Sequence, residues 1–421
     1  MGAFVIRGCE IYLGGAFVPA ELEVRGGVVT ALGGGIVPGE GASVYNFKNC
    51  IVVPGLADVH VHLREPGFSY KETVASGTRA AARSGYAALC AMPNLSPVPE
   101  DAATLAQELD IIRRDAVIDV LPYGAITRGQ RGEQLADMSA MSPYVCGFSD
   151  DGRGVQSREL MRAAMLEAKR LGKPIAAHCE DNSLLRGGYI HEGEYAKAHG
   201  HRGICSESEW GPIARDIELL RETGCAYHVC HISTAESAAL IRSAKREGLD
   251  ITCETAPHYL LLSDSDLQED GRFKMNPPLR SERDRLALIE ALRDGTIDIL
   301  ATDHAPHSAE EKSRGLAGSA FGITGLETAF PLLWTGLVEP GIITRERLVE
   351  LMSTAPARRF GIESGIEPGG PATFAVFETE TTYRIDPERF ASKGRATPFA
   401  GREVRGRCVL IVVRGREVWR A

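Results

Sequence analysis

The sequence lacks long apolar runs, and its longest hydrophobic stretches have the length of a single strand. A membrane-spanning helix needs about 20 consecutive apolar residues, so we expect none. The opening Met-Gly-Ala-Phe-Val-Ile lacks the basic start of a secretory signal, and no Ser or Thr follows Gly2 at the offset that myristoylation requires. We therefore expect a chain without a leader or a lipid anchor.

Paired cysteines and an excess of positive charge are missing as well. The 10 cysteines have no paired spacing, which predicts reduced thiols in the cytoplasm rather than a disulfide framework. A net charge of −9 argues against general nucleic-acid binding. The chain shows no repeats, and its 421 residues leave room for more than one domain with its own core.

His60 and His62 stand two positions apart at the end of an apolar run. Side chains alternate along a strand, so both imidazoles point to the same face, as a metal at a strand end requires. Arg64 has the same parity and carries a guanidinium that suits a carboxylate. Taken alone, a His-x-His pair fits two structural strand histidines at least as well.

Further metal-binding residue types follow other β-like runs. One lone His or Asp at a strand end is usually structural, but several in one chain, separated by helical segments, are typical of a parallel α/β barrel. The catalytic rim of such a barrel lies at the carboxyl ends of its strands. The residues that end these runs are Asp150, Asp151, His178, His231 and Asp303.

Helical apolar spacing fills the intervals between these strands. We predict an α/β fold, a (β/α)8 TIM-like barrel that forms the metal-dependent catalytic domain at residues 54–364. Helices are expected at residues 73–83, 157–171, 234–247 and 281–292. Barrel strands are expected near residues 56–62, 87–93, 117–124, 143–149, 174–178, 226–232, 251–256 and 298–303.

Short β-like runs with glycine turns occupy both ends of the chain. They predict one small composite β-sandwich built from residues 1–53 and 365–421. Two separate β appendages are the alternative.

Several longer motifs make the chain similar to a known family. It resembles the dihydroorotases of the amidohydrolase superfamily, in the bacterial type related to the dihydroorotase domains of multifunctional pyrimidine-synthesis enzymes. The resemblance spans essentially the whole chain and is carried by His-Val-His-Leu-Arg-Glu-Pro-Gly at 60–67, Ala-Met-Pro-Asn at 91–94, Ser-Asp-Asp-Gly at 149–152, Glu-Thr-Ala-Pro-His at 254–258, Lys-Met-Asn-Pro-Pro-Leu-Arg at 274–280, Asp-His-Ala-Pro-His at 303–307 and Phe-Gly-Ile-Thr-Gly at 321–325.

The resemblance implies reversible cyclisation of N-carbamoyl-L-aspartate to (S)-dihydroorotate plus water, the third step of de novo pyrimidine (UMP) biosynthesis, by a binuclear-zinc hydroxide mechanism. His60, His62 and Asp303 would hold the first Zn2+, and His178 and His231 the second. Many superfamily members bridge the metals with a carbamylated lysine, which the stretch at 149–152 lacks. The resemblance therefore implies a bridging aspartate, with Asp151 preferred over Asp150.

Asp303 would also carry the catalytic proton between the attacking water and the ring nitrogen. His304 is expected to be structural, His228 to face the surrounding helices, and Cys230 to face away from the metals. Whether residues 307–320 form a lid stays open. The substrate contacts that the resemblance implies are His62, Leu63, Arg64, Asn94, Asn276, His307, Phe321 and Gly322.

Three other functions compete with this one. An allantoinase or dihydropyrimidinase-type cyclic amide hydrolase would not need the carboxylate clamp of Arg64. A non-catalytic homologue that scaffolds aspartate transcarbamoylase would be expected to lose metal ligands, and a nucleobase deaminase would lack the Asp151 bridge. We expect a small-molecule substrate and neither nucleic acid nor membrane as partner. A homodimer and a complex with aspartate transcarbamoylase both stay open.

Overall fold

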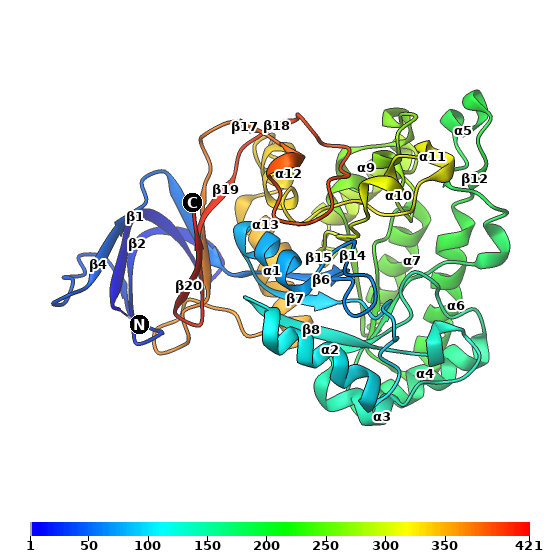
Figure 1. The fold of residues 1–421 in the computed structure, drawn as a ribbon, viewed down its shortest axis with the longest axis horizontal. Coiled ribbons are helices and arrows are strands. Elements are labelled where there is room, and N and C mark those ends of the chain that lie inside the picture. Colours follow the sequence, from blue (N-terminus) through cyan, green and yellow to red (C-terminus); the bar gives the residue numbers. More distant parts are fainter. Residues whose placement is uncertain (1) are drawn as a thin grey trace.

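Eight parallel strands, paired in chain order, form the larger unit of the computed structural model, which describes residues 2–421 (Figure 1). A parallel bridge between Val61 and His304 joins the last strand to the first, and the His62 amide donates to the His304 carbonyl at 2.9 Å. The predicted (β/α)8 barrel is confirmed. Its strands are β6 (Leu56–Val61), β7 (Tyr86–Ala91), β8 (Asp119–Ala125), β9 (Gly147–Ser149), β10 (Ile175–Ala177), β13 (Tyr227–Val229), β14 (Ile251–Thr255) and β15 (Ile299–Leu300).

Amphipathic helices connect these strands and cover the barrel. The four helices expected from the sequence are present, and each begins at a Thr or Ser side chain that accepts a hydrogen bond from a backbone amide of the first turn. Gly172 ends α4 in the left-handed conformation, with φ of 66°. The longer helices are α1 (Val74–Arg83), α2 (Ala102–Asp115), α4 (Arg158–Leu171), α6 (Glu207–Thr223), α7 (Ala235–Arg246) and α9 (Glu282–Arg293).

Shorter helices and strands lie at the rim and at the far end of the barrel. The excursion after β10 protrudes from the barrel and contains β11 (Ile190–His191), α5 (Glu194–His199) and β12 (Gly203–Ile204) (Figure 1). The remaining short helices are α3 (Met138–Met141), α8 (Pro257–Leu261), α10 (Ala309–Lys312), α11 (Gly315–Gly318), α12 (Ala329–Leu333), α13 (Arg345–Val349) and α14 (Ala355–Phe360).

The second unit is a mixed sheet that lies beside the barrel and contains strands from both termini (Figure 1). β16 pairs with β5 on one side and with β19 on the other, so the two ends of the chain meet within the sheet. Its eight strands form one hydrogen-bonded sheet with its own apolar core. They are β1 (Phe4–Leu13), β2 (Ala16–Arg25), β3 (Val28–Gly33), β4 (Ser43–Asn46), β5 (Cys50–Pro54), β16 (Phe374–Glu378), β19 (Arg407–Val413) and β20 (Arg416–Arg420).

Between β16 and β19 the chain leaves this sheet and returns to the barrel. It forms a two-stranded pair, β17 (Tyr383–Arg384) with β18 (Glu403–Val404). Residues 391–396 lie against the barrel, where the Lys393 amide donates to Glu72 at 3.2 Å and Thr324 N donates to Ala396 O at 2.8 Å. The C-terminal segment therefore supports the rim, and the division at residues 53 and 365 stays a prediction.

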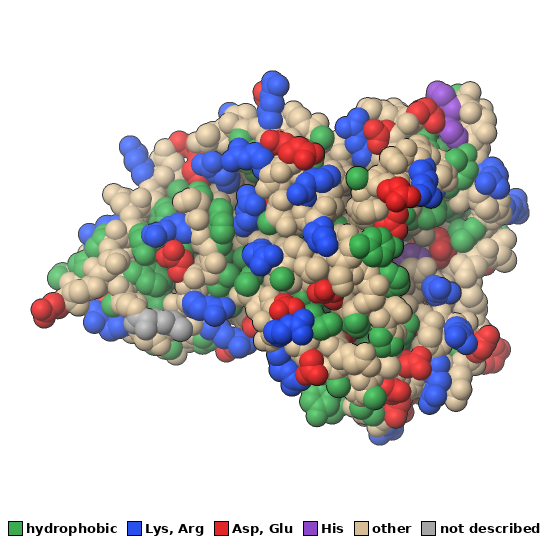
Figure 2. Space-filling view, viewed as in Figure 1, with side chains coloured by type: hydrophobic (Ala, Val, Ile, Leu, Met, Phe, Trp, Pro, Cys, Tyr) green, Lys and Arg blue, Asp and Glu red, His purple; other side chains and the backbone are tan. Residues whose placement is uncertain are grey.

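The surface and the thiols agree with the composition. Figure 2 shows Lys and Arg side chains interspersed with Asp and Glu over the visible face. Within residues 2–421 no helix combines the length and apolarity that a membrane span requires. The described cysteines are all free thiols, and nine of the ten are buried.

Glu108 on α2 is an exception to the pairing of buried charges. Its side chain is 2% exposed, and Oε2 has no hydrogen-bond partner among the described residues. Burial in apolar surroundings raises the pKa of this carboxyl well above its ordinary value of 4.5. The folded protein therefore binds this proton more tightly than the unfolded chain does.

We predict that Glu108→Met stabilises the protein increasingly with pH. In the wild type the contribution of Glu108 to the free energy of unfolding is fully present below about pH 4.5, the ordinary pKa of the carboxyl. It is lost as pH rises towards the higher pKa of Glu108 in the folded protein. The variant removes this loss, so its free energy of unfolding should exceed that of the wild type by about 1–3 kcal/mol at pH 8. Denaturant titrations at pH 5 and pH 8 measure the difference. A gain of the same size at both pH values would assign the effect to packing instead.

Candidate metal centre

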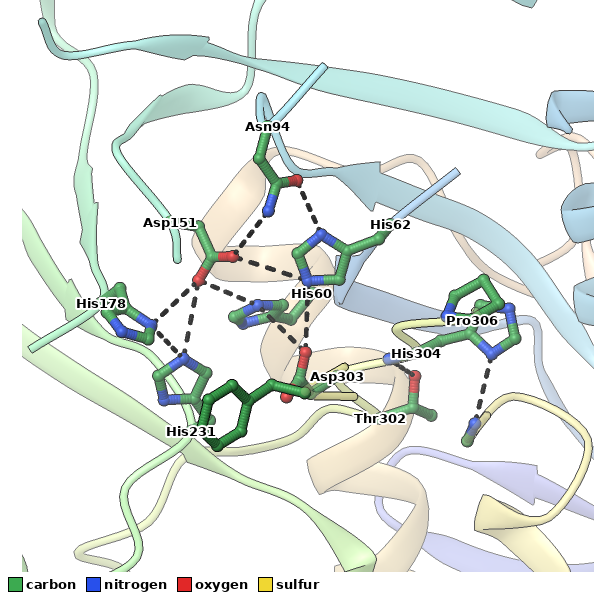
Figure 3. A network of polar contacts seen from close by, with 12 residues as sticks. His60, His62, Asn94, Asp151, His178, His231, Thr302, Asp303, His304 and Pro306 are labelled. Atoms are coloured by element: carbon green, nitrogen blue, oxygen red, sulfur yellow. Dashed lines mark hydrogen bonds and ion pairs between the residues drawn. The ribbon is translucent and has the colours of Figure 1, made fainter. Parts of the chain in front are cut away.

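Six side chains from the carboxyl ends of the barrel strands converge on one point. Asp151, which follows β9, lies at its middle (Figure 3). Its Oδ1 is 3.3 Å from His60 Nε2, 3.4 Å from His178 Nδ1 and 3.6 Å from His231 Nε2. Its Oδ2 is 3.5 Å from His62 Nε2.

Asp303 completes one side of the cluster. Its Oδ1 lies 3.3 Å from His62 Nε2 and 3.6 Å from His60 Nε2. His178 Nδ1 and His231 Nε2 lie 2.9 Å apart on the other side of Asp151. The structure thus brings together the six residues predicted as ligands, in two groups that share Asp151.

The rim residues owe their direction to strained backbone. His231 and Asp303 follow the last residues of β13 and β15 and have φ of 34° and 47°, and Arg64 has φ of 62°. The left-handed region is unfavourable for residues other than glycine and is common at functional sites. At His231 this turn aims the imidazole at the centre, whereas simple alternation along β13 would direct it elsewhere.

The predictions for His228 and Cys230 are corrected for this reason. His228 is fully buried, and its Nε2 lies 3.1 Å from Glu254 Oε2. The Cys230 thiol forms a compact buried group with His60 and Glu254. These two residues share one face of β13, and His231 reaches the centre only because its backbone turns after Val229.

A second layer of polar groups fixes the imidazoles. The Glu254 carboxylate lies 2.5 Å from His60 Nδ1, and the Asn94 Oδ1 lies 2.8 Å from His62 Nδ1. Protons on these Nδ1 atoms leave the Nε2 lone pairs of both rings free to bind a metal beside Asp151 and Asp303. Glu180 Oε2 holds His178 from the other end, 3.5 Å from Nε2.

The cluster has the donor set and the charge of a cation site. His60 Nε2 and Asp151 Oδ1 are buried without hydrogen-bond partners among the described residues. Burial alone would lower the pKa of His60, yet the Glu254 and Asp151 carboxylates outweigh it and raise that pKa well above its ordinary value. At His178 burial also lowers the pKa, but the Asp151 and Glu180 carboxylates outweigh it and raise that pKa to about 10. A pocket that attracts protons this strongly suits divalent ions between imidazole and carboxylate ligands.

Asp150 is engaged elsewhere. One of its carboxylate oxygens accepts from the Ile126 amide at 2.8 Å and the Thr127 amide at 3.1 Å, and the other accepts from the Thr127 hydroxyl. Asp150 therefore braces the turn after β8, and the geometry favours Asp151 as the shared ligand.

The residues predicted to bind substrate lie in different surroundings. Arg64 is 8% exposed, and its guanidinium contacts the Pro306 carbonyl at 3.3 Å and His307 Nε2 at 3.4 Å. Asn276 lies on the His178 side, where its amide donates to Glu180 Oε1 at 2.8 Å. Asn94 is held by the metal ligands themselves, and the Leu63 side chain is buried in the apolar core.

His307 is held as a neutral ring. Its Nε2 donates to the Phe321 carbonyl at 2.7 Å, and its Nδ1 accepts from Lys71 at 3.3 Å. Burial, Arg64 and Lys71 lower the pKa of His307 to about 3. His307 therefore holds the Phe321 carbonyl beside Arg64 without adding a charge.

His304 is structural, as expected. Its Nδ1 accepts from the Gly325 amide at 3.2 Å, and its Nε2 lies 3.4 Å from Glu72. Glu72 also accepts from Ser392 and Lys393, so the C-terminal segment anchors the residue that follows Asp303. Sequence reasoning missed Glu72, Glu180 and Glu254, although Glu254 opens one of the motifs that carry the resemblance.

Comparisons with known proteins agree on the fold and the family. A family model for dihydro-orotase-like proteins matches residues 49–237. The chain is 47% identical to a dihydroorotase of Bacillus caldolyticus, over 100% of this chain and 99% of that one. It is also 47% identical to a dihydroorotase of Geobacillus kaustophilus (strain HTA426), with the same coverage.

Solved structures of cyclic-amide hydrolases share the architecture. An L-hydantoinase (dihydropyrimidinase) from Arthrobacter aurescens is 25% identical, with a TM-score of 0.88 over 99% of this chain and 96% of that one. A dihydropyrimidinase from Brevibacillus agri NCHU1002 is 22% identical, with a TM-score of 0.86 over 99% and 95%, and shows likeness of fold alone.

We predict that the protein binds two divalent ions and that Asp151→Ala loses at least one of them, because Asp151 is the carboxylate common to both ligand groups. Asp150→Ala is the matched control, since it removes the neighbouring carboxylate and should keep both ions. The control should lower the free energy of unfolding by about 1–3 kcal/mol, because the donors around Asp150 lose their partner. Metal analysis by mass spectrometry and thermal unfolding measure the two effects. Metal loss in Asp150→Ala alone would move the shared ligand to Asp150.

Proposed function

Because the chain belongs to the dihydroorotase family of metal-dependent amidohydrolases, we propose that it interconverts N-carbamoyl-L-aspartate and (S)-dihydroorotate plus water with two zinc ions at the centre around Asp151. We also propose that the enzyme is cytoplasmic and serves pyrimidine synthesis. The partners to test are a second copy of the chain and aspartate transcarbamoylase.

A buried guanidinium beside the metal centre is the observation that favours a substrate with a carboxylate. Arg64 is 8% exposed, and its contacts are a backbone carbonyl and a neutral imidazole. Burial lowers the pKa of Arg64 to about 10, so it stays charged at neutral pH. A buried charge without a carboxylate partner is costly, and a carboxylate supplied by the ligand removes that cost. Both N-carbamoyl-L-aspartate and dihydroorotate carry one, whereas hydantoin and dihydrouracil do not.

His60, His62 and Asp303 would hold one zinc ion, His178 and His231 the other, and Asp151 both. When bound, the ions supply Lewis acidity that polarises the ring carbonyl and brings the pKa of a water towards neutrality. Glu254 and Asn94 keep the imidazoles of His60 and His62 oriented through their Nδ1 atoms.

Asp303 is the residue that moves the proton. Nearby imidazoles outweigh the effect of burial and keep the pKa of Asp303 below its ordinary value, so it stands ready as a base. In ring opening it accepts the proton of the attacking water and delivers it to the ring nitrogen as the C–N bond breaks. Arg64, Asn276 and the Phe321–Gly322 backbone hold the ring during this transfer.

The direction of the reaction depends on pH. Opening dihydroorotate creates a second carboxylate and releases one proton to solvent. Ring closure is therefore favoured at acidic pH and ring opening at alkaline pH. This balance follows from the substrates and holds for any catalyst of the reaction.

Substrate preference tests the proposal. The metal-loaded protein should open dihydroorotate far faster than dihydrouracil, hydantoin or allantoin, and prolonged chelation should abolish the activity. Faster turnover of a neutral ring would favour the hydantoinase or allantoinase alternative. A metal-loaded protein that turns over none of the four would support a scaffolding role.

We predict that Arg64→Met lowers kcat/KM for dihydroorotate at least tenfold while leaving dihydrouracil hydrolysis nearly unchanged. The lost charge-assisted pair is worth roughly 2–5 kcal/mol. Arg64→Lys is the matched control, because it keeps the charge and the backbone strain but loses the planar fork, and it should lose less activity. Steady-state kinetics on both substrates measure the effect. Equal losses on the charged and the neutral ring would make Arg64 structural.

We also predict that Asp303→Asn lowers kcat by about 10²–10⁴-fold in both directions, because an amide cannot accept the proton. Asn keeps the size and one oxygen donor, so metal content should fall only in part and substrate KM should change far less. Initial rates of opening and closure, measured beside metal content, give the answer. Near-wild-type rates with both ions bound would reduce Asp303 to a ligand and make His307 the first alternative for the proton.

A further inference from the structure

Lys312, the last residue of α10, has a buried ammonium group. The residue is 8% exposed, and its Nζ donates to the carbonyl oxygens of Lys274 at 2.9 Å, Ala320 at 2.8 Å and Gly322 at 2.7 Å. All three ammonium protons therefore have acceptors, and each acceptor belongs to the backbone.

The three acceptors belong to two segments of the proposed substrate site. Ala320 and Gly322 flank Phe321, whose carbonyl holds His307, and Lys274 stands two residues before Asn276. The two segments also meet directly, because the Gly322 amide donates to the Lys274 carbonyl at 3.1 Å. The Lys274 ammonium lies 4.5 Å from the centroid of the Phe321 ring.

The position of this backbone leaves little freedom. Gly322 has φ of 127°, which a residue with a side chain rarely adopts, and a Cβ there would lie 2.6 Å from the Ala305 carbonyl and 3.2 Å from His307 Nε2. The backbone at residue 322 thus packs directly on the stretch that follows Asp303. A shift of this segment would move His307 and, through it, the surroundings of Arg64.

A methionine would fill the same space at a lower desolvation cost than an ammonium. Burying an ammonium is unfavourable unless hydrogen bonds replace its water, and those bonds are stronger than bonds between neutral groups. Three bonds from one group fix the relative positions of two loops, which an apolar side chain cannot do. The other residues of α10 support this placement, since Glu311 on the same turn pairs with Lys71 at 2.9 Å.

We propose that Lys312 is a positioning residue that ties the Phe321–Gly322 backbone to the segment of Asn276 and thereby sets the substrate-binding edge of the site. The inference rests on the proposed function, because it assumes that these two segments contact the substrate. Lys312 itself acts through backbone carbonyls and takes no part in proton transfer or metal binding.

The test is Lys312→Met in the metal-loaded, full-length enzyme, which keeps the length of the side chain and removes its three donors. We expect KM for dihydroorotate to rise at least tenfold, about 1.4 kcal/mol, while kcat changes less than KM and metal content stays at the wild-type level. Lys197→Met is the matched control, because Lys197 pairs with Glu194 on the exposed α5, and it should leave KM and kcat unchanged. A folded Lys312→Met enzyme with wild-type KM, or one that loses metal and kcat together, would overturn the proposal.

If Lys312→Met does not fold, hydrogen exchange of backbone amides in the wild-type enzyme tests the proposal. The Gly322 and Ala320 amides donate to backbone carbonyls, and the tie through Lys312 should keep both protected without substrate. Exchange at the rate of an unstructured loop would contradict it. The exchange measurement does not depend on activity. A protein that does not turn over dihydroorotate would contradict the proposed function, and the exchange result would still test the role of Lys312 separately.

Discussion

The centre depends on a positive charge held between Asp151 and the imidazoles around it. His60 Nε2 and Asp151 Oδ1 face each other at 3.3 Å, buried and without hydrogen-bond partners among the described residues. Carboxylates gathered in a barrel mouth of low dielectric repel one another unless a cation lies between them. A divalent ion bound there would remove this repulsion, so metal binding and the order of the rim would be coupled.

The rest of the fold supplies the order that this arrangement needs. The Asp58 carboxylate accepts from the amides of His60 at 3.1 Å and Thr302 at 3.2 Å, which joins β6 to the end of β15. Glu72 joins the rim to residues 392–393 of the C-terminal segment. Rigid support of this kind is what keeps His231 and Asp303 in a left-handed backbone that they would not adopt alone.

Much of this molecule could be predicted from its sequence because its strands are short apolar runs that end in polar residues. That pattern placed the barrel strands and seven candidate ligands, and the family resemblance reduced these to six. Alternation along a strand failed for His228 and Cys230, because the chain turns between Val229 and His231. The preference for Asp151 over Asp150 rested on the resemblance alone, and the structure adds a physical reason, because Asp150 is occupied by Ile126 and Thr127.

The residues that support the ligands could not be predicted from the sequence, for a different reason. Glu254 and His60 are 194 positions apart, and Glu72 and His304 are 232 apart. Nothing local in the sequence distinguishes Glu72 from the many glutamates that lie at the surface, and the motif that contains Glu254 does not show that it contacts His60. Lys312 stands in a charged stretch typical of a solvated loop, and only the folded chain turns its ammonium inward onto three carbonyls.

Anomalous diffraction from crystals of the zinc-loaded protein would show whether two ions share Asp151. We expect two peaks at the zinc edge, one among His60, His62 and Asp303 and one beside His178 and His231, with the Asp151 carboxylate in contact with both. A single peak, or two peaks that do not share Asp151, would contradict this expectation.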